Sequence, residues 1–299
     1  MRTTGRVALS ARSRWRSVAT AVAAFVLLVV VWELVKVVVP DDGVVVGGTR
    51  ILPRTSDAAM PHVWTVLGRL FTPEVAGAAQ QRSVGAAVAL GALFTLRLAL
   101  GGLVLGGVLG VLLALLMQRS GLLERALLPY VVASQTVPLI AIAPLVAGWG
   151  GKIVVFGQPW QPWASVMVIA AYLAFFPIAV GMLRGLASPR PADVELFRAL
   201  ACGWWTTLLR LRLPASVPFV IPAVRLAAAA AVIGAIVAEI TTGTRGGIGR
   251  LIIEYAQAAT GDPSRMYTAI LGAAVLGLLA AAAVGLLDLA LRRYQSVAR

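Results

Sequence analysis

The sequence predicts an all-α integral membrane protein with six transmembrane helices. Hydrophobic residues make up 60% of the 299 positions, charged residues make up only 13%, and the mean hydropathy is +0.89, which does not describe a soluble core. A helix needs about 20 apolar residues to cross the hydrocarbon of a bilayer. Six stretches meet this length and are separated by charged or Pro- and Gly-rich breaks: residues 18–39, 92–117, 127–149, 163–183, 217–239 and 267–290.

The basic residues set the expected orientation. A net charge of +14 on a soluble domain would suggest nucleic acid, but here the charge has a different distribution. With a cytoplasmic N-terminus, 15 of the 26 Lys and Arg residues fall on inner segments and nine fall on the longer outer segments. Basic residues are enriched in cytoplasmic loops. We therefore expect a multi-pass protein of the cell inner (plasma) membrane that contacts membrane lipid, has both termini in the cytoplasm and binds no nucleic acid.

Composition divides the chain into three regions. Residues 1–39 are expected to form a basic cytoplasmic tail and an anchor helix, because the first apolar run exceeds the roughly 7 to 15 residues of a cleaved signal. Residues 40–90 form an extracytoplasmic segment whose amphipathic helix, near 61–71, lies on the outer membrane surface or packs over the bundle. Residues 91–299 form a five-helix core with a polar loop at 189–214.

Glycines recur every fourth residue in the second span, at Gly102, Gly106 and Gly110. This spacing lets two helix backbones approach closely in lipid. It predicts a helix contact, either within the subunit or across a dimer.

The third and fourth spans combine prolines with polar residues at membrane depth. The prolines are Pro138, Pro144 and Pro177. Polar groups at this depth are costly unless they face the bundle or a water-filled path. Gln135, Thr136 and Tyr172 are therefore candidates for lining a translocation path. An alternative stays open, in which Ser134 and Thr136 bond back to their own helix and Gln135 bridges two helices.

Ionisable residues are rare in the spans: Glu33, Arg97, Arg225, Glu239 and Asp288. All but Arg97 can reach an interface, so anchoring is expected for those four. One histidine, His62, and one cysteine, Cys202, provide no metal cluster, Ser/His pair or disulfide. The glycine-rich run 243–249 lacks the ending of a phosphate loop and predicts a flexible turn before an amphipathic piece at 248–256. We expect no catalytic, cofactor or metal site, and no enzyme.

The polar loop 189–214 has the features of a docking helix. Pro189 and Pro191 mark its start, and Asp193 and Glu195 place negative charge in the first turn, where it suits the helix dipole. An apolar set is available to fill a groove in a partner: Leu196, Phe197, Leu200 and Trp204. The plainer interpretation is a solvated inner loop whose charges only set topology.

The spacing within this loop is specific. Glu195 is followed six residues later by Ala201 and nineteen residues later by Pro214. This resembles the signature loop of permease subunits of ATP-binding-cassette importers, which has Glu-Ala-Ala, a glycine six positions after the Glu, and an Ile-x-Leu-Pro ending. The matching residues are Glu195, Leu213 and Pro214, whereas Leu196 and Phe197 replace the alanines, Ala201 the glycine and Leu211 the isoleucine.

Other segments resemble the taurine, nitrate and sulfonate branch of these importers: residues 133–138, 143–145, 176–177, 234–239 and 246–249. The resemblance covers roughly residues 90–295. It implies a type I importer permease fold, a translocation path for a small solute, and coupling to a separate ATPase that this chain does not contain. The implied partners are ATP-binding-cassette ATPase subunits, a second permease subunit in a homodimer, and an extracytoplasmic solute-binding protein.

The resemblance also implies a set of ATPase-coupling residues: Glu195, Leu196, Phe197, Arg198, Ala201, Trp204, Leu213 and Pro214. The rival class is a self-contained channel or secondary transporter, which usually shows internal repeats or charged midplane sites that this sequence lacks. The substrate stays open among sulfonates, nitrate, pyrimidine precursors and riboflavin-like compounds. The segments around 135–138 and 235–239 point toward the vitamin-precursor members.

Overall fold

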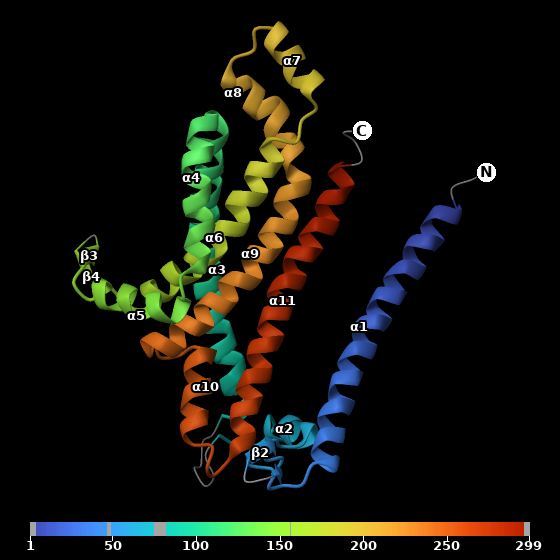
Figure 1. Ribbon diagram of the computed structural model, residues 1–299, viewed down its shortest axis with the longest axis vertical. Coiled ribbons are helices and arrows are strands. Elements are labelled where there is room, and N and C mark those ends of the chain that lie inside the picture. Colours follow the sequence, from blue (N-terminus) through green and yellow to red (C-terminus); the bar gives the residue numbers. More distant parts are fainter. Residues whose placement is uncertain (1–3, 47–48, 75–81, 156, 296–299) are drawn as a thin grey trace. The chain divides into compact units, whose positions relative to one another are not determined.

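The protein is built almost entirely of helices (Figure 1). A computed structural model describes residues 4–46, 49–74, 82–155 and 157–295. The helices are α1 (Thr4–Val38), α2 (Val63–Arg69), α3 (Val84–Arg119), α4 (Gly121–Ala133), the 3-10 turn η1 (Ser134–Thr136), α5 (Leu139–Gly150), α6 (Pro162–Leu186), α7 (Pro191–Ala199), α8 (Trp204–Thr207), the π-helical turn η2 (Leu208–Arg212), α9 (Leu213–Thr242), α10 (Ile248–Gln257) and α11 (Pro263–Gln295).

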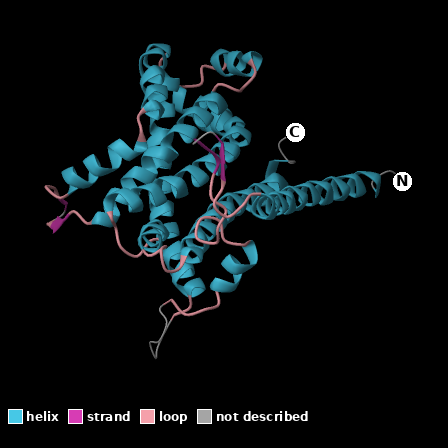
Figure 2. Ribbon diagram, turned by 60° about the horizontal axis from the view of Figure 1, so that its bottom comes forward, coloured by secondary structure: helices cyan, strands magenta, loops and turns pink. Residues whose placement is uncertain are grey.

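Strands form two short antiparallel hairpins in the described part of the chain (Figure 2). β1 (Val44–Val46) pairs with β2 (Thr49–Leu52), and β3 (Val154–Val155) pairs with β4 (Gln158–Pro159).

The chain divides into two compact units. Unit 1 runs up to Gly85 and includes Tyr255–Thr268, and unit 2 comprises Ala86–Glu254 and the chain from Ala269 onward.

Hydropathy located the membrane spans well. Four described helices are long and apolar enough to cross a membrane: Val84–Arg119, Pro162–Leu186, Trp204–Thr242 and Pro263–Leu286. A bent pair of helices makes a fifth if it is one span. Part of the predicted first span, residues 18–39, lies outside the described side chains, so that span stays a prediction. The all-α membrane fold is therefore confirmed, whereas the count of six spans is not.

The predicted third span, 127–149, is not one straight helix. Its two halves, α4 and α5, meet at 99°. Val137 is extended, with φ −75° and ψ 126°, as expected for a residue that precedes a proline, and Pro138 is the N-cap residue of α5. Pro129 and Pro144 lie inside helices without breaking them. Pro138 fixes the break at this point, and the two halves form the predicted span only if the bent pair crosses the membrane as one.

The predicted glycine contact joins α3 to α6 within the subunit. A Cβ atom added to Gly102 would lie 2.4 Å from the Cβ of Ala170, and one added to Gly106 would lie 2.5 Å from the carbonyl oxygen of Ala171. Gly110 is equally close to the backbone of α6. Since no side chain larger than hydrogen fits at these positions, the two helices pack with their backbones in near contact.

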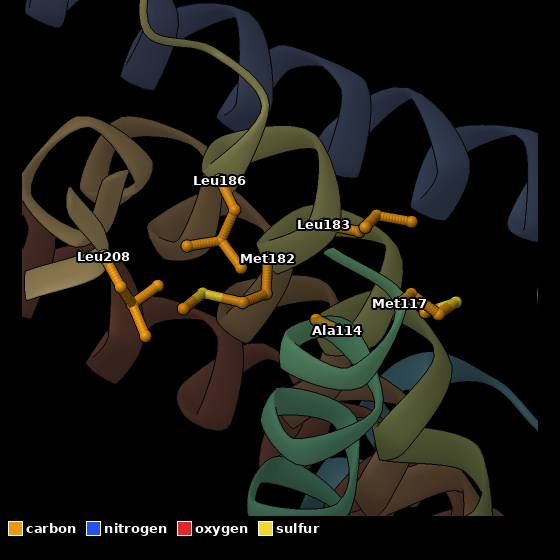
Figure 3. Close-up of a cluster of buried hydrophobic side chains, with 6 residues drawn as sticks. All are labelled: Ala114, Met117, Met182, Leu183, Leu186 and Leu208. Atoms are coloured by element: carbon orange, nitrogen blue, oxygen red, sulfur yellow. The ribbon is translucent and has the colours of Figure 1, made fainter. Parts of the chain in front are cut away.

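Apolar side chains from three segments pack where unit 2 carries its polar loop (Figure 3). The buried members are Ala114, Met117, Met182, Leu183, Leu186 and Leu208. Leu208 belongs to η2, so this cluster fixes the start of the helix that follows the loop to the ends of α3 and α6.

That helix begins earlier than expected. The sequence placed the end of the loop at residue 214 and the next span at 217–239, but the chain is helical from Trp204 to Thr242. Pro214 lies at the first turn of α9, directly after the π-helical turn η2. The wider π turn shifts the local hydrogen bonds, so the missing N–H of Pro214 does not end the helix.

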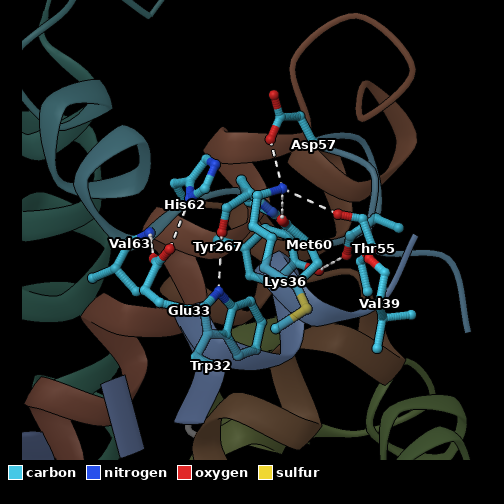
Figure 4. A network of polar contacts seen from close by, with 12 residues as sticks. Trp32, Glu33, Lys36, Val39, Thr55, Asp57, Met60, His62, Val63 and Tyr267 are labelled. Carbon is cyan, nitrogen blue, oxygen red and sulfur yellow. Dashed lines mark hydrogen bonds and ion pairs between the residues drawn. The ribbon is translucent and has the colours of Figure 1, made fainter. Parts of the chain in front are cut away.

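Unit 1 is held together by polar side chains at the end of α1 (Figure 4). Lys36 Nζ donates to the Thr55 carbonyl oxygen (3.0 Å), Asp57 Oδ1 (2.6 Å) and the Met60 carbonyl oxygen (2.7 Å). Glu33 accepts from the Val63 N–H at the start of α2 (2.8 Å). The hydrogen bond and charge of Lys36 hold the pKa of Asp57 below its usual range. The segment before α2 is thereby attached to α1, and the predicted helix near 61–71 is confirmed as α2.

Candidate functional site

The polar loop contains a short, well-formed helix, α7 (Figure 1). Pro191 occupies its first position, where a missing N–H costs nothing. Asp193 lies in the first turn and accepts two hydrogen bonds from the Arg190 guanidinium, at 2.9 and 3.1 Å. The Arg190 hydrogen bond and charge hold the pKa of Asp193 below its usual range. The ionised carboxylate suits the positive end of the helix dipole.

One face of α7 is apolar and exposed. Leu196 and Leu200 are four residues apart, so they lie on the same side of the helix, and they are 56% and 64% exposed. Trp205, in α8, is 67% exposed. Large apolar side chains are thus left exposed on an otherwise polar loop.

A left-handed residue ends α7. Ala201 has φ of 52°, and its N–H donates to the Arg198 carbonyl oxygen at 2.9 Å. The N–H of Cys202 donates to the Phe197 carbonyl oxygen, also at 2.9 Å. These two bonds form a Schellman motif, which normally has glycine at the left-handed position. The importer signature also has glycine at this position, and the backbone conformation explains that preference.

The base of the loop is fixed to the core. Arg212 donates to the Leu186 carbonyl oxygen (3.0 Å), and the Ser188 hydroxyl donates to the Ala215 carbonyl oxygen (3.2 Å), so the chain before α7 is tied to the chain after it. The Arg119 guanidinium lies 5.1 Å from the centre of the Trp204 ring. The two ends of the loop are therefore joined to each other and to α6 and α9.

The structure sorts the predicted coupling residues into two groups. Those on the outside of the loop are Glu195, Leu196, Arg198, Ala201 and Pro214, with Phe197 partly covered. Trp204 and Leu213 instead pack against the apolar cluster at the base. Sequence reasoning missed Arg119 and Ser188, since their contacts join segments far apart in the chain.

The candidate path residues meet at the break between α4 and α5. The Tyr172 hydroxyl donates to the Ser134 carbonyl oxygen, which joins α6 to this break. Ser134 and Thr136 donate to their own helix, to the carbonyl oxygens of Val131 (2.7 Å) and Ala133 (2.8 Å). Gln135 is exposed and donates to the Ser134 hydroxyl (3.3 Å). The backbonding alternative is thus confirmed for Ser134 and Thr136, and the bridge by Gln135 is not found among the described residues.

The sequence suggested that Glu239 anchors its span at a membrane interface, and this prediction is wrong. Its side chain is fully buried and accepts from the Thr95 hydroxyl (2.8 Å) and the Gly249 N–H (2.9 Å). Thr95 also accepts from the Ile248 N–H at 2.9 Å. The turn 243–249 is therefore clamped to α3 and α9 and is not the flexible turn that was predicted. Thr95 is 144 residues away in the chain, so no local pattern could reveal this pair.

In the described residues, no three His, Cys, Asp or Glu side chains gather in a way that could hold a metal ion.

Comparison with known proteins identifies the family of the chain. Residues 106–293 match the family described as binding-protein-dependent transport system inner membrane component. This match spans more than half of the chain.

Several permeases are similar to this chain. The formylaminopyrimidine transport permease protein ThiX of Halalkalibacterium halodurans is 35% identical over 191 residues, which cover 62% of this chain and 70% of that protein. The putative aliphatic sulfonates transport permease protein SsuC of Bacillus subtilis is 30% identical over 198 residues, covering 65% of this chain and 66% of that protein. The riboflavin transport system permease protein RibX of Chloroflexus aurantiacus is 30% identical, covering 58% of this chain and 60% of that protein.

One solved structure has a similar fold. The crystal structure of an amino acid ABC transporter with histidines matches with a TM-score of 0.54 and 19% sequence identity, covering 69% of this chain and 94% of that one. At this identity the likeness concerns the fold alone.

Proposed function

Because the chain belongs to the family of inner membrane components of binding-protein-dependent transport systems, we propose that α7 couples it to a separate ATPase subunit. The chain is a multi-pass membrane permease of the ATP-binding-cassette importer class, and such permeases are not themselves enzymes.

The observation that carries the coupling proposal is an exposed apolar face on a rigidly mounted helix. Leu196 and Leu200 are open, whereas the base of the loop is tied down by Arg212 and by the buried side chain of Leu208. An apolar helix face that fills a groove in a partner is a recurring mode of recognition. Since the base is fixed, a movement of the partner would displace α6 and α9 as rigid bodies.

The family and the distribution of basic residues support the remaining parts of the proposed assembly. The end of unit 2 that carries α7 faces the cytoplasm, where ATP is available, and both termini lie there too. A second copy of the chain completes the path, with Gln135, Thr136 and Tyr172 lining it, and lipid surrounds the spans. An extracytoplasmic binding protein delivers the solute, which is drawn from the classes that the relatives' names give: a formylaminopyrimidine, an aliphatic sulfonate or riboflavin.

Co-purification tests the coupling proposal. Tagged permease is co-expressed with a candidate ATPase subunit and extracted in detergent, and the bound ATPase is quantified. Glu195→Lys, and separately a proline inserted after Phe197, are expected to lose the ATPase while still inserting into the membrane. The control Asp42→Lys reverses an exposed charge beyond the end of α1 and is expected to retain the ATPase. Retention by both loop variants at the wild-type level would refute the proposal.

A further inference from the structure

Unit 2 has an open cavity at the ends of α3, α6 and α9 that lie opposite to α7. Its volume is about 470 Å³. It is lined by Phe94 of α3, Trp163 at the start of α6, Thr242 at the end of α9, and Thr244 and Arg245 of the following turn. Since α6 has 25 residues and a helix rises about 1.5 Å per residue, this cavity is about 35 Å from α7.

The lining combines aromatic rings with an available cation. Trp163 is 46% exposed and Arg245 is also exposed. Within the described part of the chain, no carboxylate forms an ion pair with Arg245, in contrast to Arg69, Arg190 and Arg250. An aromatic face binds planar rings by stacking, and a guanidinium binds anionic or carbonyl oxygens.

The turn that carries Arg245 is held in place by its backbone. Gly243 ends α9 with φ of 67°, and Gly246, with φ of 98°, passes beside the Phe94 ring. A Cβ atom on Gly247 would lie 2.1 Å from the Glu239 carboxyl carbon, so only glycine lets the turn approach this buried group. Glu239 thus acts as a positioning residue that fixes Arg245 beside the two rings.

We propose that this cavity is a solute-binding site for a planar aromatic or heteroaromatic compound that carries an anionic or carbonyl oxygen group. The inference rests on the proposed importer function and narrows its substrate class. A cavity of this volume is within the usual range of about 300 to 1,000 Å³ for small-molecule sites. Of the solutes in the relatives' names, the heteroaromatic ones use both the rings and the cation, whereas an aliphatic sulfonate would use only Arg245.

Binding to the full-length chain in lipid nanodiscs tests the site with two probes of equal charge. Naphthalene-2-sulfonate carries a planar ring system, and hexane-1-sulfonate carries none. Calorimetry is expected to show naphthalene-2-sulfonate binding at least about tenfold more tightly, since stacking on one aromatic side chain is worth about that factor. Equal affinities, or no measurable binding of either probe, would overturn the proposal.

Variants locate the binding. Trp163→Ala is expected to weaken naphthalene-2-sulfonate binding about tenfold and Arg245→Gln about fivefold, whereas Trp163→Phe keeps a ring and stays within about threefold of wild type. Trp149→Ala removes a tryptophan that is also exposed, at 63%, but lies outside the cavity lining, and it should change nothing. If Trp163→Ala binds the probe as tightly as Trp149→Ala does, the site is wrong.

The two proposals fail separately. Trp163→Ala is expected to retain the ATPase in co-purification, because the cavity is remote from α7. If the wild-type permease does not retain the ATPase in co-purification, the coupling proposal is refuted. If naphthalene-2-sulfonate and hexane-1-sulfonate bind equally tightly, the solute site is refuted.

Discussion

Replacing Ala201 by glycine should stabilise the carboxyl end of α7. The φ of 52° at Ala201 is left-handed, and this conformation costs an L-residue about 1 to 2 kcal/mol. Glycine also increases the conformational freedom of the unfolded chain, which reduces this stabilisation by about 0.4 to 1 kcal/mol. The net stabilisation is therefore about 0.5 to 1 kcal/mol, which corresponds to about a two- to fivefold change in the opening equilibrium.

Hydrogen–deuterium exchange measures this change directly. The reporters are the N–H groups of Ala201 and Cys202, whose hydrogen bonds close the end of α7. In the full-length chain in nanodiscs, Ala201→Gly should slow their exchange about two- to fivefold.

Ala199→Gly is the matched control. Ala199 ends the right-handed part of α7, where glycine costs about 0.5 to 1 kcal/mol, so exchange there should become faster. If both substitutions accelerate exchange, Ala201 is not left-handed and the account of the missing signature glycine is wrong.

Three further outcomes are expected. Gly106→Ala should lower the free energy of unfolding in detergent by about 1 to 3 kcal/mol, because the added Cβ would lie 2.5 Å from a carbonyl oxygen. Gly107→Ala should be close to neutral, because its Cβ would lie 3.6 Å from the nearest atom. Equal losses of stability in the two variants would contradict the close packing of α3 on α6. Lys36 lowers the pKa of Asp57, so their ion pair stabilises unit 1 above the unfolded pKa of this carboxyl, and the stabilisation is lost as pH falls through the folded pKa. Exchange protection of residues 55–63 should therefore differ between wild type and Asp57→Asn at neutral pH and converge as the pH falls through the folded pKa, and a pH-independent difference would count against this. In a background without the natural cysteine, Gln135→Cys and Tyr172→Cys should react with an aqueous thiol reagent, and inertness in every nucleotide state would exclude them from the path.

The spans were predictable because hydropathy averages over many residues. The spans around α3, α6, α9 and α11 were all located from apolar runs. Their boundaries were less predictable, and α3 begins at Val84, eight residues before the expected position. The break at Pro138 could not be distinguished from the tolerated Pro129 and Pro144, because the outcome depends on the backbone conformation of the residue before the proline.

The loop helix was predictable because its signals are local. Pro191 and Asp193 are read directly from neighbouring positions, whereas Glu195, also expected in the first turn, lies beyond it because the helix begins at Pro191. The anchoring of the loop was not predictable, since Arg119 meets Trp204 across 85 positions of sequence. Glu239 was misassigned for the same reason: its partners Thr95 and Gly249 come from other segments, and only the folded chain shows that they surround it.

The central claim is that a nucleotide-driven partner holds α7. Hydrogen exchange of residues 191–203 should be measured with and without the purified ATPase subunit and a non-hydrolysable ATP analogue, with α10 as the internal reference. The account predicts that the amides of α7 exchange at least about fivefold more slowly in the complex while those of α10 are unchanged. An ATPase that binds the permease and leaves the exchange of α7 unaltered would contradict it.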